Sequence, residues 1–375
     1  SLGNMGVGEG GGELVKQLLK NTWDINAPEV VLVWLEGAPK KGVGPHDVAI
    51  SLVKATFESG VVKNKVLEFA GPGVKNLPID FRNGIDIMTT ETTCLSSIWI
   101  TDDEVKHHYE IHERPQDYRE LKPGDVAYYD MMIRIDLSTQ ESMIALPFHP
   151  SNAVTIHELQ ADPVGILTRI EEDAKKRFGD KVDVHLVDKV VDGKVQADQG
   201  IIAGCSGGTY DNLAEAAAIL KGKNIGNDYF TASAYPQSTP VSMAVTREGI
   251  TADLIEAGVV MKPAFCGPCF GAGDVPSNNG LSIRHTTRNF PNREGSKPGQ
   301  GQLSLVALMD ARSIAATAAN GGIITAATDV EYENTHKPYV YDDKIYKCRV
   351  YNGFGKARPE TELRYGPNIK DWPKM

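Results

Sequence analysis

The sequence lacks any apolar run long enough to cross a membrane. A membrane-spanning helix needs about 20 consecutive apolar residues, whereas the longest candidate run, residues 30–35, has the length of a strand. Basic residues are also in deficit, because 39 Lys and Arg stand against 49 Asp and Glu and leave a net charge of −10. The composition therefore predicts neither a membrane protein nor a nucleic-acid-binding protein.

Cysteine is scarce as well, with five residues among 375. An odd and sparse set favours a reducing compartment, here the cytoplasm, and predicts metal-binding or catalytic thiols before disulfides. The first residues, Ser1-Leu2-Gly3-Asn4, have neither the basic nor the apolar region of a signal peptide, and they include no starting methionine. We therefore expect the sequence to begin inside a longer natural protein.

Apolar, β-branched runs alternate with stretches of helical period, and this alternation is typical of the α/β class. The strand-like runs occupy residues 30–35, 131–137, 200–204 and 257–261. Helices are predicted near residues 46–58, 162–178, 209–221, 238–248 and 303–319. This spacing suits parallel strands joined by crossover helices. Because a single core rarely exceeds about 250–300 residues, we expect more than one domain.

Local signals place several element ends and one long loop. Asp162-Pro163 and Ser238-Thr239-Pro240 predict helix starts, and Thr101-x-x-Glu104 predicts a capping box. A domain boundary is expected within residues 145–150. Residues 280–302 are rich in Asn, Arg, Gly and Pro, which predicts a long loop with a functional role.

The sequence opens with Gly6-x-Gly8-x-x-Gly11, which formally matches the dinucleotide-binding fingerprint. That motif requires a preceding strand and an acidic residue about 20 positions further on. No strand is predicted before Gly6. We therefore interpret the glycines as a close approach between a loop and the helix expected to open at Glu13.

Three cysteines carry the strongest signal for chemistry. Cys266-Gly267-Pro268-Cys269 is compatible with a redox dithiol, half of a zinc site, two ligands of an iron–sulfur cluster, or two buried thiols at a turn. Cys205 follows a predicted strand and precedes a glycine-rich turn, and ligands of open α/β sheets bind at such carboxyl ends. Three thiolates without a fourth predict a cluster with one open iron, whereas a zinc site would recruit His285.

Arginines are concentrated in residues 284–293 of this acidic protein, at Arg284, Arg288 and Arg293. Paired guanidinium groups bind carboxylates in a bidentate manner, so a di- or tricarboxylate is the natural ligand. The alternative is a solvated basic loop.

The order and spacing of these motifs resemble those of the aconitase superfamily, which includes aconitate hydratase, homoaconitase and isopropylmalate isomerase. The resemblance rests on Cys205, on Cys266-Gly267-Pro268-Cys269 and on Arg288-Asn289-Phe290-x-x-Arg293, and it extends to residues 68–74, 88–93, 147–150 and 311–319. It implies aconitase-like, three-layer α/β/α domains with mainly parallel sheets.

The resemblance also implies a site. Cys205, Cys266 and Cys269 would ligate a [4Fe-4S] cluster whose fourth iron binds substrate. Glu91 matches the family's catalytic glutamate near that iron, and Arg288 and Arg293 match the pair that holds the substrate carboxylate. The implied function is that of an iron–sulfur hydro-lyase, a hydratase or dehydratase of a hydroxy di- or tricarboxylate.

The same resemblance implies an order of domains. Residues 1–24 would be the tail of a preceding domain, 25–148 the second domain, 149–330 the third, and 331–375 a linker arm. The family's serine base lies on a swivelling domain, and neither it nor the Asp-Ser-His segment of the first domain has a counterpart here. We therefore expect a fragment that is inactive alone and whose partners are the missing N-terminal and swivel domains.

Departures from the family pattern concern the site itself. Ser206-Gly207 stands where the family has Thr-Asn, and Ile87 and Thr287 stand where it has asparagines near the cluster. Because polar groups around a metal site tune both substrate fit and the metal, these changes predict a divergent hydratase branch and argue against citrate. Two other readings stay open: a non-catalytic iron-sensing or regulatory cluster protein, and a zinc-structured binding domain.

Overall fold

The computed structural model describes residues 2–6, 11–20, 22, 24–226, 229–291, 297 and 300–350, and further on 353, 355–362, 364 and 366–367. The chain divides into two compact units, Ser1–Tyr341 and Asp342–Met375. The second unit contains the short helix α12 (Lys344–Arg349). Within the described part of the chain, we find no helix with the length and apolar character that crossing a bilayer requires.

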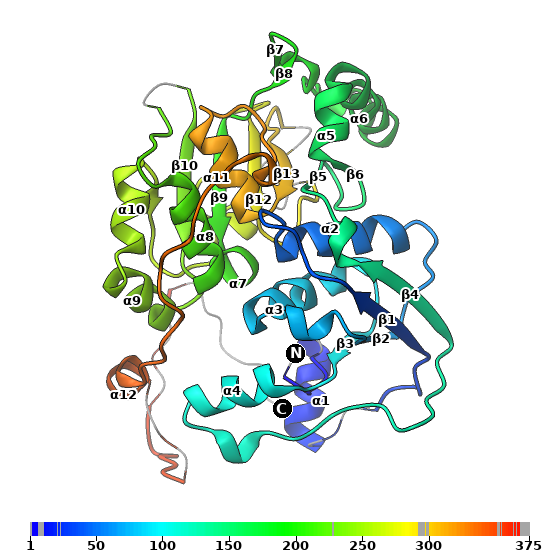
Figure 1. Cartoon of the computed structure of the whole chain (residues 1–375), viewed down its shortest axis with the longest axis vertical. Coiled ribbons are helices and arrows are strands. Elements are labelled where there is room, and N and C mark those ends of the chain that lie inside the picture. Colours follow the sequence, from blue (N-terminus) through cyan, green and yellow to red (C-terminus); the bar gives the residue numbers. More distant parts are fainter. Residues whose placement is uncertain are drawn as a thin grey trace. The chain divides into compact units, whose positions relative to one another are not determined.

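The first sheet of the larger unit has four strands, all parallel, in the order β3-β2-β1-β4 (Figure 1). Its strands are β1 (Val30–Glu36), β2 (Val66–Ala70), β3 (Ser96–Trp99) and β4 (Met131–Asp136). Along β1, Val31, Val33 and Leu35 are fully buried while the residues between them are partly exposed. One face of this sheet therefore forms a core with the helices that follow β1 and β2.

The second sheet has seven strands in the order β11-β10-β9-β12-β13-β5-β6. Its strands are β5 (Met143–Ala145), β6 (Ala153–Thr155), β9 (Gln199–Ala203), β10 (Thr231–Tyr235), β11 (Val260–Met261), β12 (Leu281–His285) and β13 (Leu305–Met309). The five strands from β9 to β13 are parallel, and β5 and β6 add an antiparallel edge. A separate small hairpin pairs β7 (Val190–Val191) with β8 (Lys194–Val195).

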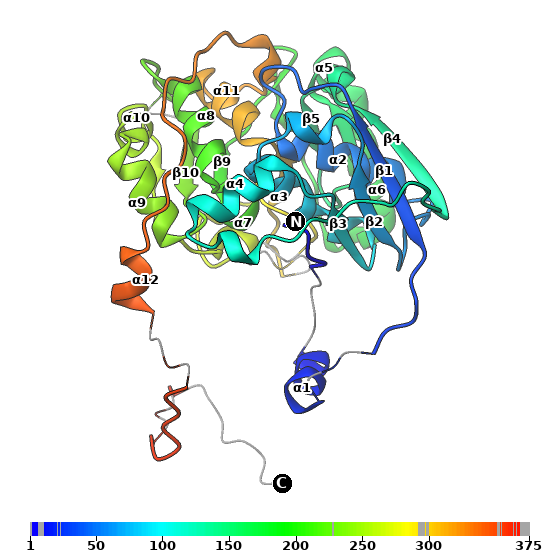
Figure 2. The same ribbon diagram turned by 60° about the horizontal axis from the view of Figure 1, so that its bottom comes forward.

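Helices cover both faces of the second sheet. The α-helices of the larger unit are α1 (Gly11–Lys20), α2 (Pro45–Thr56), α3 (Ile79–Met88), α4 (Asp103–Ile111), α5 (Ile156–Ala161), α6 (Pro163–Phe178), α7 (Gly204–Gly207), α8 (Tyr210–Leu220), α9 (Thr239–Arg247), α10 (Ile250–Glu256) and α11 (Ala311–Ala319). The main core joins α8, α10 and α11 to one face (Figure 2).

Helix α2 packs against both sheets and so joins them. Val48 and Leu52 belong to the core of the first sheet, whereas Ala49 and Ile50 pack with side chains of β13 and β5 in the second. The α/β class with mainly parallel sheets is confirmed, and helices on both faces make the second sheet a three-layer α/β/α arrangement.

Most predicted helices form within two residues of their expected bounds. One predicted helix is wrong in its first part, which is a strand. Asp162 and Ser238 are N-caps as expected, each accepting a backbone hydrogen bond from the helix it precedes. The helix expected over 303–319 begins only at Ala311, because Leu305–Met309 is the fully buried strand β13. Apolar residues run through both elements, and periodicity alone does not separate a buried strand from a buried helix.

Two further expectations need correction. The N-cap of α4 is Asp102, whose carboxylate accepts from the Val105 amide at 3.2 Å, and not Thr101. The loop expected over 280–302 contains the buried strand β12. The polar residues Ser282, Arg284 and His285 suggest a loop in the sequence, but all three are buried in the structure.

Some predictions lie beyond the described residues or stay untested. Gly8 is outside the described residues, and α1 begins at Gly11 instead of Glu13. The domain bounds at residues 24, 148 and 330 stay predictions.

Candidate active site

The candidate site lies where the strand order of the second sheet reverses. From β9 the chain adds β10 and β11 on one side, while β12 and β13 lie on the other. Ligands of open α/β sheets bind outside the carboxyl ends of the strands at such a switch point. Strand β9 ends two residues before Cys205, and β12 ends three residues before Arg288. The topology therefore brings two predicted site residues to one edge.

The three predicted cysteines lie together at this edge. Gly204 has a φ of +67°, and a Cβ atom placed on it would lie 3.8 Å from the Cys266 Sγ and 3.9 Å from the Cys269 Sγ. Burial, and next the neighbouring Cys266 thiol, raise the pKa of Cys205. The backbone amides of Cys205 and Ser206 oppose the rise, and the guanidinium of Arg288 opposes it to a smaller extent. None of these three cysteines is in a disulfide.

Short turns set the backbone around these thiols. Cys205 lies in the single helical turn α7, and Gly207 in that turn packs so closely on β12 that a Cβ atom would lie 2.3 Å from the His285 carbonyl oxygen. Cys266 precedes a 3₁₀ turn that ends at Cys269, and the Cys269 amide donates to the Cys266 carbonyl at 3.0 Å. Glycine and proline at these positions are thus required by close approach and turn geometry.

This donor set fits an iron–sulfur cluster better than a single zinc ion. Among the described residues, no three His, Cys, Asp or Glu side chains converge on one metal position. A cluster places each thiolate on a different iron, so its ligands need not meet at a point. His285 Nδ1 already accepts the Ala311 amide at 2.9 Å, which weakens the alternative of His285 as a zinc ligand.

Glu91 and Arg288 form an ion pair that spans the two sheets. Glu91 lies in the 3₁₀ turn that follows α3, and its side chain is 4% exposed against 33% for Arg288. Arg288 Nε donates to Glu91 Oε1 at 2.5 Å. The same guanidinium favours the thiolate of Cys205, so one cation acts on both the predicted acid–base group and one predicted cluster ligand. Arg293 lies outside the described residues, and its role in carboxylate binding stays a prediction.

Arg284 differs from the expectation that three arginines share one loop. It lies within β12, and it is 1% exposed. Its Nη1 donates to the Pro268 carbonyl at 2.7 Å and its Nη2 to the Asp274 carbonyl at 3.0 Å. Arg284 is therefore part of the protein interior behind the cysteine turn and not a group that grips substrate. Its sequence neighbours gave no signal of this role.

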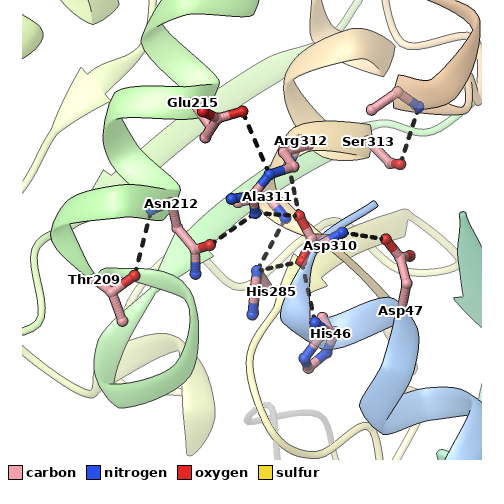
Figure 3. Close-up of polar contacts among 12 residues, drawn as sticks. His46, Asp47, Thr209, Asn212, Glu215, His285, Asp310, Ala311, Arg312 and Ser313 are labelled. Atoms are coloured by element: carbon pink, nitrogen blue, oxygen red, sulfur yellow. Dashed lines mark hydrogen bonds and ion pairs between the residues drawn. The ribbon is translucent and has the colours of Figure 1, made fainter. Parts of the chain in front are cut away.

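A buried polar network adjoins the same strand end (Figure 3). Asp310 caps α11 and accepts hydrogen bonds from the His46 amide at 3.1 Å, the Arg312 amide at 3.0 Å and Arg312 Nη1 at 3.1 Å. The rings of His46 and His285 lie 4.1 Å apart, and burial lowers the pKa of His285 to about 4. This network ties the start of α2 to the second sheet, and sequence reasoning did not identify it.

Comparison with known proteins agrees with this geometry. The sequence profile of the aconitase family (aconitate hydratase) matches residues 1–316. The large subunit of 3-isopropylmalate dehydratase from Elusimicrobium minutum is 26% identical over 301 residues, which are 80% of this chain and 63% of that protein. A second such large subunit, from Rubrobacter xylanophilus, is 28% identical over 88% of this chain and 68% of its own length.

Mitochondrial homoaconitase from Mycosarcoma maydis is also similar, with 28% identity over 78% of this chain but only 39% of the homoaconitase. The chain thus spans about two thirds of the dehydratase subunits and about two fifths of this longer relative. The matched region contains both sheets and every residue of the candidate site. The chain belongs to the aconitase family.

Proposed function

We propose that this chain forms the cluster-bearing part of an iron–sulfur hydro-lyase, which adds water to or removes it from a hydroxy di- or tricarboxylate. The observation that carries the proposal is the position of Arg288, whose guanidinium contacts Glu91 and acts electrostatically on Cys205, the cysteine whose preceding residue, Gly204, lies beside the Cys266 and Cys269 thiols. A fixed cation beside thiols that would ligate a metal can bind the substrate carboxylate that lies next to the reacting hydroxyl group.

In this proposal Cys205, Cys266 and Cys269 hold a [4Fe-4S] cluster, which supplies Lewis-acid polarisation of the substrate hydroxyl when bound. Arg288 binds a substrate carboxylate, and Arg293 is its proposed partner. Glu91 is positioned to hold or transfer a proton at that hydroxyl. Because Glu91 and the substrate carboxylate would share one guanidinium, substrate binding loosens the Glu91–Arg288 ion pair and frees the Glu91 carboxylate for this work.

A complete active site in this proposal requires a further domain or subunit. The relatives from Elusimicrobium and Rubrobacter are named large subunits, and no residue of the present sequence matches the family's serine base. We infer that the base is supplied by the missing swivel domain or by a small subunit, and that the preceding domain completes the other side. Cysteines that are not in disulfides suit the reducing cytoplasm, which we propose as the location.

The cofactor is tested by measuring iron, acid-labile sulfide and zinc after anaerobic reconstitution. The parent protein should bind iron and sulfide and develop visible absorption, and Cys205→Ala should lose a ligand and most of the absorption. Cys348→Ala is the matched control, because Cys348 is an exposed thiol of the smaller unit. Zinc alone, or no metal in the parent, would contradict the cluster.

The substrate is tested on the protein at its full natural length, with any partner subunit present. Turnover should be measured on citrate, isocitrate, homocitrate and isopropylmalate. The divergent residues Ile87 and Thr287 lead us to expect that citrate is not the preferred substrate. Robust citrate turnover would show that this inference is wrong while leaving the hydro-lyase assignment intact.

A further inference from the structure

One buried side chain holds the turn that contains Cys266 and Cys269. Arg284 uses all three guanidinium nitrogens: Nη1 donates to the Pro268 carbonyl at 2.7 Å, Nη2 to the Asp274 carbonyl at 3.0 Å, and Nε to the Ser282 hydroxyl at 2.9 Å. Pro268 lies between the two cysteines, and Asp274 lies five residues beyond Cys269. The guanidinium therefore binds the segment 266–274 at two points, at the turn between the cysteines and at the end of the segment.

The position of Arg284 in the sheet connects this segment to the third cysteine. Arg284 is in register with Ile201 of β9, four residues before Cys205, and with Leu308 of β13 on its other side. Strand β9 leads directly into the turn that holds Cys205. A single side chain thus spans from the strand beside the Cys205 turn to the backbone of the Cys266–Cys269 turn.

Neighbouring groups hold Arg284 and its target in place. The Ser282 hydroxyl that accepts from Arg284 donates to Gln199 Oε1 at 2.8 Å. The carboxylate of Asp274 accepts from the Tyr235 hydroxyl at 2.5 Å and lies 3.7 Å from the Lys262 ammonium. Side chains from β10 and β12 therefore contact the segment that contains the two cysteines, and Gln199 of β9 binds the serine that orients Arg284.

We propose that Arg284 is a positioning residue which sets the distance between the Cys266–Cys269 turn and Cys205, and thereby determines how firmly the cluster is retained. The inference rests on the proposed function, because it assumes that these thiols ligate a cluster. A planar guanidinium reaches two carbonyls and a hydroxyl in fixed directions, and an ammonium group at the same place does not reproduce that fork. Outer groups that orient ligands commonly change metal affinity about 10–100-fold.

The test compares reconstituted full-length parent protein with Arg284→Lys and Arg284→Met. Iron and sulfide content, the visible and paramagnetic-resonance spectra, and the rate of iron release to a chelator are measured beside thermal unfolding. We expect both variants to release iron about 10-fold faster than the parent and to show altered spectra. Lysine keeps the charge but not the geometry, so it should not rescue retention.

Arg82→Lys is the matched control. Arg82 is also fully buried, and it donates to the Leu77 and Val74 carbonyls and to Asp102, but it contacts none of the three cysteines. It should lower the unfolding temperature without accelerating iron release. Equal acceleration in both arginine variants would assign the effect to general destabilisation and would overturn the inference.

Two milder variants keep the proposal testable where Arg284 substitutions fail to fold. Ser282→Ala removes the hydroxyl that orients Arg284 Nε, and Tyr235→Phe removes the hydroxyl bound to Asp274; both should accelerate iron release less than Arg284→Lys does. Parental retention in Arg284→Lys, or in both milder variants, overturns this inference alone. A parent that takes up no iron and sulfide overturns the proposed function and this inference together.

Discussion

Gly204 is a residue whose Cβ position lies beside two thiols. Its φ of +67° is a left-handed conformation that costs other residues about 1–2 kcal/mol. A methyl group there would make ordinary van der Waals contact with two cysteine sulfurs and would take up space beside them that the proposed cluster would use. We expect Gly204→Ala to lower the free energy of unfolding by about 1 kcal/mol and to reduce iron and sulfide uptake, measured by urea unfolding and by reconstitution.

Gly222 offers a matched control for this prediction. Its φ is +71°, and a Cβ atom there would meet no atom within 4 Å. Gly222→Ala should therefore have a similar effect on stability and leave metal uptake unchanged. Full uptake by Gly204→Ala would show that the space beside the thiols is not needed.

Arg288 is the partly exposed half of an ion pair whose other half is buried. Replacing it with lysine keeps the charge but removes the planar donors that bind a carboxylate in a bidentate manner. We expect Arg288→Lys to lower kcat/KM of the full-length enzyme by about 100-fold through substrate misplacement. Arg177→Lys, at an exposed position of α6, should retain parental kcat/KM. Equal activity in Arg288→Lys would remove Arg288 from the site.

Among single residues, the sequence predicted those that belong to a short motif and not those that act through distant partners. The spacing of the cysteines and Arg288 is itself a signal, and the structure brings the cysteines together, while the roles of all four residues stay predictions. Arg284 was wrongly predicted to lie in a loop, because its hydrogen-bond partners, Pro268 and Asp274, are 16 and 10 residues away in the sequence. Nothing local distinguishes a buried arginine that binds carbonyls from one that faces solvent.

At the level of elements, the cap of α11 also anchors α2. Asp310 accepts from both Arg312 and the His46 amide, and Gly44 leaves it room, since a Cβ atom there would lie 2.1 Å from a carboxylate oxygen. Asparagine is about as good an N-cap as aspartate, but it offers no negative charge to Arg312. Because breaking a buried ion pair costs about 3–5 kcal/mol and Glu215 remains 3.5 Å from Arg312, we expect Asp310→Asn to cost about 3 kcal/mol in urea unfolding.

The control for this prediction is another Asp N-cap. Asp162 caps α6 by accepting the Gly165 amide at 3.0 Å. Asp162→Asn should change the free energy of unfolding little, because the cap survives the substitution. A small effect at both positions would mean that the Asp310 charge contributes nothing beyond capping.

Elements with clear local signals were predicted well, and buried ones were not. The N-caps of α6 and α9 follow from residue type, and β1 from its apolar run. Strand β12 was missed because Ser282, Arg284 and His285 look polar in sequence although each is buried. The type of such an element depends on partners that the sequence does not reveal.

For the molecule as a whole, a helix that packs on the first sheet and a helix that packs on the second bring the carboxylates of Asp80 and Asp211 together. Asp80 of α3 accepts from the Asp211 amide of α8 at 3.3 Å. Burial, and next the charge of Asp80, raise the pKa of Asp211 to about 7. The positive charge of Arg312 opposes this rise, and the negative charge of Glu215 adds a little to it. Burial also raises the pKa of Asp80, opposed by bonds to Asp211 and Thr209 and by the charges of His112 and Arg312.

This pair predicts how stability depends on pH. The unfolded state loses the Asp211 proton near pH 3.8, whereas the folded state keeps it to about pH 7. The free energy of unfolding should therefore fall as pH rises through this window. Asp211→Asn should flatten the fall and exceed the parent in stability above pH 7, as measured by urea midpoints at several pH values. Asp173→Asn, at an exposed ion pair, should follow the parent curve; a parallel curve for Asp211→Asn would contradict the prediction.

The α/β class of the molecule could be read from the sequence, but the way the two sheets join could not. Helix α2 has apolar residues around most of its circumference, which indicates burial without naming the partners. Only the structure shows that Val48 and Ala49 face different sheets.

The ion pair between Glu91 and Arg288 joins residues 197 positions apart. At a ribosomal rate of about 5–20 residues per second, roughly 10–40 seconds separate the synthesis of the two. Cys205 emerges during that interval, before its companion thiols. In the proposed function, the nascent chain therefore displays one cluster ligand well before the other two, and a cluster held by all three thiols forms only after Cys269 has left the ribosome.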